Sequence, residues 1–177
     1  MEAQTPHHKM IDLFGELIRR SDHWHFLWLT TGPNELIEKP MVERKIDSGH
    51  YTIKRVDQSE VSSYLSACDA GVAFYKPAPS RLATSPVKLS EYVACGLPVV
   101  INEGIGDSDT LVANEKLGSV ITDFSVSEYE QACAAIEKLV STADVTRDLV
   151  RKVAERRFDL RAVGAERYAR LYERVLN

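Results

Sequence analysis

The sequence has few cysteines, and they lack the arrangements that would give them a function. Only three occur in 177 residues, with no CxxC pair and no even-numbered set. Neither a disulfide framework nor a thiolate metal site is therefore expected. Cys68, Cys95 and Cys133 lie in separate helical patterns, and we expect them to be reduced and to pack as small core residues.

Long hydrophobic runs are also missing. No apolar stretch approaches the roughly 20 residues that a helix needs to cross a bilayer, and no signal peptide opens the chain. We therefore expect a soluble, cytoplasmic protein, with peripheral contact at the cytoplasmic face of a membrane left open as an alternative.

Charge of one sign does not dominate either, since the formal net charge is only -4. This balance gives no general attraction for nucleic acid. The segment from Arg147 onward differs, because it carries nine Arg or Lys against five Asp or Glu. Such a helical end could contact phosphates or an anionic membrane, but a solvated helix face is the favoured interpretation.

What the sequence does contain is short apolar runs that alternate with longer amphipathic ones. The runs that read as strands are Phe26–Gly32, Tyr51–Val56, Ala70–Tyr75, Pro98–Asn102 and Ser119–Phe124. Between them, helical stripes begin near Met10, Val61 and Tyr129, and a last stripe begins near Tyr168. This alternation predicts an α/β fold, a doubly wound parallel sheet with helices on both faces.

The predicted organisation is one domain over residues 1–177, closed by helices over 147–177. A doubly wound domain usually starts with a strand, whereas a helical pattern follows directly after the polar segment MEAQTPHHK. We therefore expect a first strand, and a whole preceding domain, to lie outside this sequence. His7 and His8 are predicted to belong to a mobile lead before the helix.

The stretch SPVKLSEYVACGLPVV, residues 85–100, predicts a helix followed by a strand. Ser85 suits the N-cap, Pro86 the first helical position and Gly96 the left-handed position after the end. Lys88 is unusual there, because a cation lies near the positive end of the helix dipole.

Two interpretations of Lys88 and Glu91 remain open at this point. Three residues apart, they share a helix face and could form a surface ion pair worth about 0.3–0.5 kcal/mol. Alternatively, Lys88 and free backbone N–H groups could bind a phosphate, while Glu91 accepts hydrogen bonds from the hydroxyls of a ribose.

The same stretch, continued as SPVKLSEYVACGLPVVINEGIGD, resembles the donor-site core of the group 1, retaining glycosyltransferases of GT-B fold. The upstream segment VDQSEVSSYLSACDAGVAFY and the closing segment RFDLRAVGAERYARLYERVL are also similar to that family, in family order. The resemblance implies a C-terminal half that binds a nucleotide diphosphate sugar, with an acceptor-binding N-terminal half as its partner. It also implies sugar transfer with retention, without a metal or another cofactor.

The resemblance implies a role for several residues. Glu91 matches the second Glu of the family's E-x7-E motif, which holds the ribose. The loop and helix start beside the sugar and diphosphate are matched by Ser85, Pro86, Val87 and Lys88. Arg55 and Val56 fall where such domains contact the nucleotide base. No residue is assigned a catalytic role.

One departure from the family pattern concerns the sugar. The first Glu of E-x7-E would lie at position 83, which is Ala83 here, and Arg81 is the candidate to replace its contacts. This difference leaves two alternatives open. One is a nucleotide-sugar epimerase of similar architecture, and the other is a non-catalytic module that binds a nucleotide or a protein.

Two further patterns are given ordinary structural interpretations. The run Gly104–Asp109 lacks the third glycine of a dinucleotide fingerprint, so it is predicted to be a tight turn, with Asp109 as a possible helix cap. His23 and His25 flank Trp24 without a third ligand, so exposed positions before a strand are favoured over a metal site.

Overall fold

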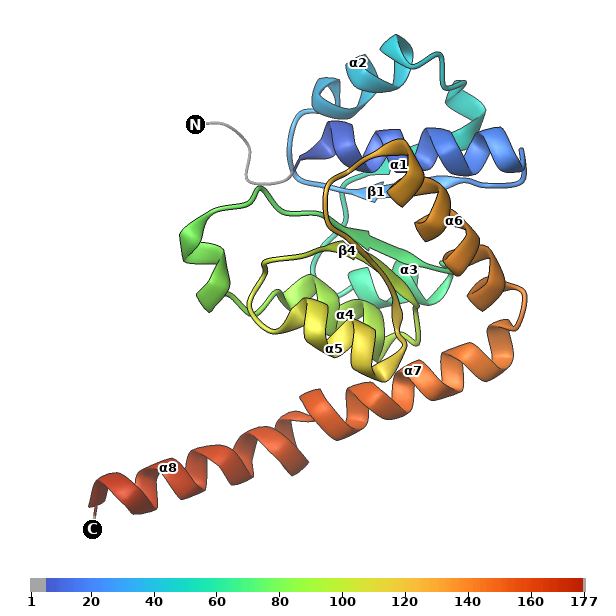
Figure 1. Ribbon diagram of the computed structural model, residues 1–177. Coiled ribbons are helices and arrows are strands. Elements are labelled where there is room, and N and C mark those ends of the chain that lie inside the picture. Colours follow the sequence, from blue (N-terminus) through green and yellow to red (C-terminus); the bar gives the residue numbers. More distant parts are fainter. Residues whose placement is uncertain (1–5, 177) are drawn as a thin grey trace.

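The computed structural model describes residues 6–176, in which parallel strands alternate with helices (Figure 1). The helices are α1 (His7–Arg20), α2 (Glu35–Glu43), α3 (Val61–Ser66), α4 (Val87–Ala94), α5 (Ser108–Glu115), α6 (Val126–Val140), α7 (Ala143–Phe158) and α8 (Glu166–Leu176). The strands are β1 (Phe26–Leu29), β2 (Tyr51–Lys54), β3 (Gly71–Ala73), β4 (Val99–Asn102) and β5 (Gly118–Ile121). Short helical turns occur at η1 (Ser48–His50), η2 (Pro79–Ala83) and η3 (Leu160–Ala165).

All five predicted strands are present in the predicted order, and every strand pairing is parallel. They form two sheets among the described residues, one of β1 and β2 and one in the order β3-β4-β5. Most strands end before the predicted apolar runs do, because those runs continue into the loops at the carboxyl ends. The predicted run that ended at Val56, for example, ends as a strand at Lys54.

Two hydrophobic clusters lie on opposite faces of the sheets. One packs under α1, α2 and α6 and includes Val100, and the other packs under α4, α5 and α7 and includes Val99 and Ile101. These three consecutive residues of β4 thus point alternately to the two faces, as side chains of a strand must. All three are nearly inaccessible to solvent, so β4 is buried on both sides, and the predicted doubly wound α/β fold is confirmed.

Two helices were not predicted as such. α2 contains Pro40 and leaves Leu36 and Val42 exposed, so no clear apolar stripe marks it in the sequence. α5 buries only Ser108 and Val112. Each helix is held by tertiary contacts on a narrow face, which a periodicity search detects poorly.

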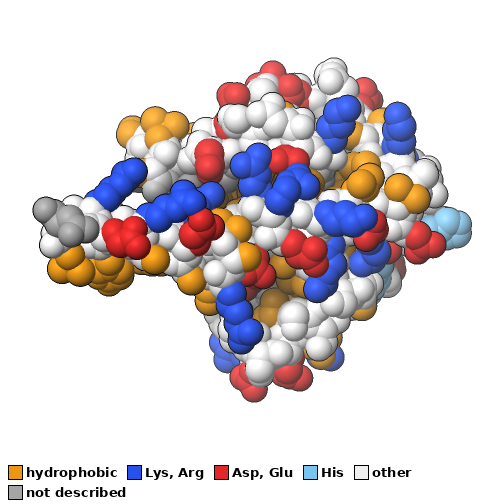
Figure 2. Space-filling model, turned by 90° about the horizontal axis from the view of Figure 1, so that it is seen from below, with side chains coloured by type: hydrophobic (Ala, Val, Ile, Leu, Met, Phe, Trp, Pro, Cys, Tyr) orange, Lys and Arg blue, Asp and Glu red, His pale blue; other side chains and the backbone are white. Residues whose placement is uncertain are grey.

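The C-terminal helix α8 extends away from the rest of the molecule, whereas α7 packs against α4 (Figure 1). Several arginines of this segment are ion-paired: Arg156 and Arg157 contact Glu115 at 2.8 and 2.7 Å, and Arg170 contacts Glu166. Figure 2 shows Lys and Arg side chains along one side of the extended segment and apolar side chains on another. The pairing favours the solvated helix face over a phosphate-binding patch.

The cysteines match their prediction only in part. Cys133 is buried in the first cluster, whereas Cys68 and Cys95 are half-buried at the ends of α3 and α4. None of the three forms a disulfide. Across residues 6–176, no helix combines the length and the hydropathy needed to cross a membrane.

Candidate functional site

The carboxyl ends of the parallel strands define one edge of the molecule, and several helices begin there. Two of these helices are α1 and α4, which begin at His7 and Val87. Burial, and secondly the charge of Lys88, lower the pKa of His7, the first residue of α1. Lys88 is exposed, so its ammonium group is available to an anion that approaches this edge.

His7 is fixed in place by an aromatic contact, since its ring meets the Trp28 ring edge-on with centroids 5.4 Å apart. Nearby in the same helix, Lys9 lies over the ring of Phe124 with Nζ 5.4 Å from the centroid. The expectation of a mobile lead was therefore wrong for His7 and His8, which form the first turn of α1. The buried residue Met10 anchors this turn to the core.

The start of α4 differs from its prediction by one residue. Pro86 is the N-cap and Val87 the first helical residue, while Ser85 lies outside the helix and is exposed. Pro86 has an extended backbone, with ψ at 117°, and therefore lies just outside the helix. Within the described residues no side chain caps α4, so its first backbone N–H groups remain open to a ligand.

Lys88 and Glu91 do not pair with each other in the described part of the chain. A carboxylate oxygen of Glu91, Oε1, instead accepts a hydrogen bond from Nε2 of Gln58 at 3.1 Å, from the loop that follows β2. The simple surface ion pair is therefore not what positions these two side chains. Gln58 orients the half-buried carboxylate of Glu91 from a distant segment of the chain.

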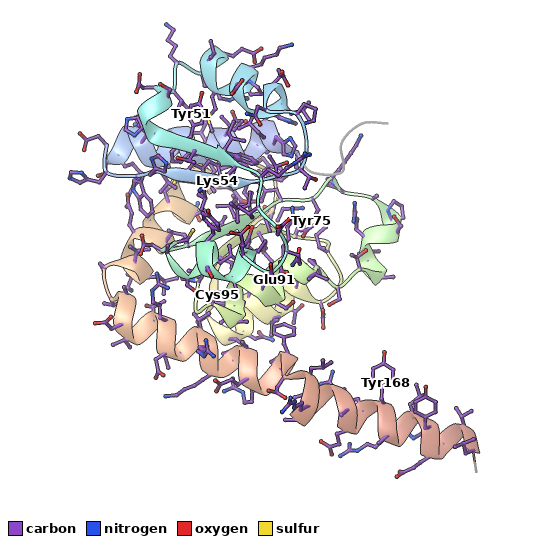
Figure 3. All side chains as sticks on the ribbon, turned by 180° about the vertical axis from the view of Figure 1, so that it is seen from behind. Tyr51, Lys54, Tyr75, Glu91, Cys95 and Tyr168 are labelled. Carbon is purple, nitrogen blue, oxygen red and sulfur yellow. The ribbon has the colours of Figure 1, made fainter. Side chains whose placement is uncertain are left out.

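Tyr75 lies beside Glu91, at the carboxyl end of β3 (Figure 3). Burial raises the pKa of its phenol, the charge of Arg81 opposes the shift and that of Glu91 adds to it. The Arg81 guanidinium carbon lies 5.6 Å from the centroid of the Tyr75 ring, a cation–π contact. The backbone N–H of Tyr75 donates to Oδ1 of the buried Asn102 at 2.7 Å, which ties this cluster to the end of β4.

The loop that carries Arg81 is held by the glycine turn after β4. Gly106 donates its N–H to the carbonyl oxygen of Arg81 at 2.9 Å. Its φ is +57°, and a Cβ at this position would lie 2.2 Å from the carbonyl oxygen of Thr84, so only glycine fits. The predicted tight turn is thus confirmed. Ala83 is exposed at the end of η2.

Asp109 acts within this turn, although it is not the N-cap. The N-cap of α5 is Asp107, and Asp109 lies in the first turn of the helix. Its carboxylate accepts hydrogen bonds from the N–H groups of Gly104 at 3.2 Å and Thr110 at 2.6 Å. The bond from Gly104 is the main cause that lowers the pKa of Asp109.

Arg55 lies in a separate hollow at the same edge. This open hollow of about 610 Å³ is lined by the loop after β1, the start of α2 and Arg55 itself. The Arg55 guanidinium donates to the carbonyl oxygen of Thr31, so it stays at the rim. Val56 is half-buried and does not line the hollow, so the structure does not bring these two predicted residues together at one surface.

The histidines near β1 have structural partners. His23 and His25 are exposed, as predicted, and the two ring nitrogens of His25 are within hydrogen-bonding distance of the Gly49 carbonyl oxygen and Thr52 Oγ1. In the part of the chain that the structure describes, no group of three or more His, Cys, Asp or Glu side chains could hold a metal ion.

Comparison with known proteins identifies the family. A family model described as "Glycosyl transferases group 1" matches residues 2–142, which is most of the chain. The chain belongs to the group 1 glycosyl transferases. The resemblance seen in the sequence is thereby confirmed. A relative from Bacillus subtilis (strain 168), named as the teichuronic acid biosynthesis glycosyltransferase TuaH, is 35% identical over 81 residues, 44% of this chain and 19% of its own.

Solved structures of glycosyltransferases share the fold of this group 1 chain at low identity. Sucrose-phosphate synthase from Thermosynechococcus elongatus superposes with a TM-score of 0.76 at 16% identity, over 98% of this chain and 43% of its own. Pneumococcal O-GlcNAc transferase GtfA, in complex with UDP and GlcNAc, superposes with a TM-score of 0.73 at 17% identity, over 98% of this chain and 34% of its own. WaaG, a glycosyltransferase involved in lipopolysaccharide biosynthesis, superposes with a TM-score of 0.70 at 15% identity, over 86% of this chain and 40% of its own. The chain thus spans less than half the length of each of these proteins.

Three residues of this group 1 site were missed in the sequence. His7, Gln58 and Tyr75 come from α1, the loop after β2 and the end of β3, and tertiary structure alone brings them to α4. The signal that could have found two of them is position: Tyr75 ends one predicted strand and Gln58 follows another, and ligands of α/β sheets bind at these ends. Finding His7 would have required the prediction that α1 begins at this residue.

Proposed function

We propose that this chain is the C-terminal, donor-binding half of a retaining glycosyltransferase. The complete enzyme would transfer a sugar from a nucleotide diphosphate sugar to an acceptor held by an N-terminal half. The observation that carries the proposal is the uncapped start of α4, which has the exposed Lys88 in its first turn and Glu91 three residues further along. Membership of the group 1 family supports it.

Lys88 and the first turn of α4 would hold the diphosphate. Open backbone N–H groups and the helix dipole attract anions, and an exposed lysine adds a point charge. His7 is neutral near pH 7 because its pKa is lowered, but a bound diphosphate would favour its protonated form. In the reaction, these groups would stabilise the charge that develops on the departing diphosphate.

Glu91 would accept hydrogen bonds from the ribose. Gln58 occupies one of its two oxygens, which leaves acceptor capacity on the other for a hydroxyl group. Ser85, Pro86 and Val87 would form the rim beside the sugar, with Arg81 above Tyr75 on the opposite side. Arg55 would contact the base from the rim of the separate hollow after β1, which Val56 does not line.

The remaining parts of the proposal rest on the family. We expect a metal-independent reaction without a further cofactor, a cytoplasmic location and contact of the complete enzyme with the membrane surface. The partner would be the acceptor-binding half, and this chain alone would not turn over substrate. One observation favours a second candidate, a non-catalytic nucleotide-binding module: the exposed Ala83 offers no carboxylate to the transferred sugar.

Thermal unfolding with UDP, GDP and ADP at millimolar concentration tests the donor site. At about 100 times Kd, a ligand that binds only the native state adds about 2.7 kcal/mol of stability. For a domain of this size, that corresponds to a rise in Tm of about 5–10 °C. No rise with any of the three nucleotides contradicts the proposal.

Paired variants assign the binding to the site. Lys88→Ala and Glu91→Gln should reduce the rise in Tm without changing the Tm of the free protein by more than about 1 °C, since Lys88 is exposed and a glutamine at position 91 can still accept the hydrogen bond from Gln58. The exposed Lys138→Ala and Glu130→Gln on α6 are matched controls and should leave the rise unchanged. An equal loss in the control variants would mean that the nucleotide binds elsewhere.

A further inference from the structure

A side-chain hydrogen bond links the two sheets at the candidate site. Gln58 lies in the turn between β2 and α3, so it follows a strand of the first sheet. Glu91 lies on α4, whose buried residues Leu89 and Val93 pack in the cluster that includes residues of β3 and β4. The bond from Gln58 Nε2 to Glu91 Oε1 measures 3.1 Å and connects residues 33 positions apart. Gln58 therefore contacts Glu91 from outside the unit that carries Glu91.

The turn that carries Gln58 is closed by its own hydrogen bonds. The Asp57 N–H donates to Oε2 of Glu60 at 3.2 Å, and the Glu60 N–H donates to the Asp57 carbonyl oxygen at 2.9 Å. Gln58 is thus enclosed in a turn directly before α3, which the buried Leu65 anchors. Because the backbone is already fixed, only the side-chain torsions of Gln58 need to be ordered when its bond to Glu91 forms.

The bond restrains a carboxylate that would otherwise rotate. A glutamate side chain has several rotatable bonds, and ordering them costs rotamer entropy. Glu91 is half-buried and accepts the hydrogen bond on Oε1, and across residues 6–176 the structure shows no hydrogen bond to Oε2. Oε2 can therefore accept a hydroxyl group of a ligand, in an orientation that the bond from Gln58 has already selected.

The donor to Glu91 is an amide and not a cation. Lys88, three residues earlier on α4, does not pair with Glu91 in the described part of the chain. A neutral donor orients the carboxylate and leaves its negative charge in place, and hydrogen bonds to a charged acceptor are stronger than those to a neutral one. A cation in the place of Gln58 would compete with a ligand hydroxyl for that charge.

We propose that Gln58 is a positioning residue for the donor nucleotide: it holds the Glu91 carboxylate so that the free oxygen meets the hydroxyl groups of the ribose. Gln58 does not itself touch the nucleotide. Selectivity for a ribonucleotide over an analogue that lacks the ribose hydroxyls therefore depends on Gln58 as well as on Glu91. This inference rests on the proposed function and adds to it a residue from outside α4.

Binding of nucleotides with and without the ribose hydroxyls tests the inference. The probe is whichever of UDP, GDP and ADP binds the unaltered chain most tightly, and it is compared with its 2′,3′-dideoxy analogue by isothermal titration calorimetry. The selectivity is the ratio of the two Kd values. A hydroxyl group that donates to a carboxylate should give a selectivity of about 10- to 100-fold in the unaltered chain.

Gln58→Ala should reduce this selectivity to about threefold or less, because Glu91 then samples other orientations. The Kd of the dideoxy analogue should change by less than about twofold, since an exposed side chain that does not touch the ligand is removed. Gln58→Glu conserves the size but presents a second carboxylate, so repulsion should abolish the selectivity as well. The matched control is Gln131→Ala on α6, an exposed glutamine whose Nε2 donates to Ser127 Oγ at 3.2 Å, and it should leave both Kd values unchanged.

A double-mutant cycle separates positioning from direct contact. The selectivity should already be low in Glu91→Ala, and adding Gln58→Ala should then change neither Kd further, because Gln58 acts through Glu91. A further loss of affinity for the ribonucleotide in the double variant would show that Gln58 contacts the nucleotide itself, which would overturn the inference.

Three other results would also overturn it. Selectivity that persists in Gln58→Ala would show that Glu91 needs no support. Equal loss of affinity for both nucleotides, with a lower Tm of the free protein, would show that Gln58 has only a structural role. Equal binding of both nucleotides by the unaltered chain would show that Glu91 does not contact the ribose. If none of the three ribonucleotides binds, the proposed function and this inference fail together, whereas binding that is insensitive to Gln58 contradicts this inference alone.

Discussion

Two glycines in the turn after β4 should respond very differently to the same substitution. Both Gly104 and Gly106 have positive φ, at +80° and +57°. A Cβ at Gly104 would meet no atom within 4 Å, whereas a Cβ at Gly106 would lie 2.2 Å from the Thr84 carbonyl oxygen. Gly104→Ala therefore tests the cost of the backbone conformation alone, and Gly106→Ala adds a collision with the backbone that leads into α4.

The magnitudes follow from these contacts. An L-residue in the left-handed region costs about 1–2 kcal/mol, which applies to both variants. Relieving the collision at Gly106 should add about 1–3 kcal/mol, the usual cost of overpacking. For a domain of this size, the extra cost corresponds to a Tm that is about 2–12 °C lower for Gly106→Ala than for Gly104→Ala. Thermal unfolding followed by circular dichroism measures the difference.

The collision should also affect the candidate site. Thr84 immediately precedes Ser85, and Gly106 holds the Arg81 carbonyl oxygen through its N–H. Displacing this segment should reduce nucleotide-induced stabilisation in Gly106→Ala and leave it intact in Gly104→Ala. Equal Tm values for the two variants would refute the reasoning, because the turn would then absorb the added methyl group without moving its neighbour.

Two further predictions concern titrating groups. Because the pKa of His7 is lowered from 6.5 in the folded chain, the unfolded chain binds a proton that the native state does not, so stability should fall as the pH drops below about 6.5. Lys88→Ala should raise the His7 pKa in an NMR titration and lessen this loss, and an unchanged pKa would mean that the two groups do not interact. Burial raises the pKa of Cys133 to about 12, so at pH 8 Ellman's reagent should label Cys95 far faster than Cys133 in the native protein. Equal labelling rates below the unfolding transition would contradict the burial of Cys133.

The fold was predictable where a segment is buried on more than one side. β4 is apolar at nearly every position because both of its faces are covered, and the glycine that ends α4 has the predicted left-handed conformation at Gly96. α2 and α5 were missed because each buries only two residues, so their sequences carry little periodicity. In these helices, tertiary packing decides the structure and local propensity does not.

The candidate site was predictable only where its residues are neighbours in one helix turn. Lys88 and Glu91 belong to a single turn of α4, so spacing alone placed them together. His7, Gln58 and Tyr75 come from three other segments, and no spacing in the sequence links them to α4. The hydrogen bond from Gln58 to Glu91 also replaces the ion pair that spacing made the simplest expectation.

The division of the sheet gives the site two halves with different supports. Lys88, Glu91 and Tyr75 are carried by the part built on β3, β4 and β5, whereas His7 is carried by α1, which packs over β1. The placement of Glu91 beside Tyr75 is therefore set within one sheet, while the separation of His7 and Lys88 depends on how the two sheets pack together. The residues carried by β3, β4 and β5 should therefore dominate nucleotide binding, and His7→Ala should reduce the nucleotide-induced rise in Tm less than Lys88→Ala does.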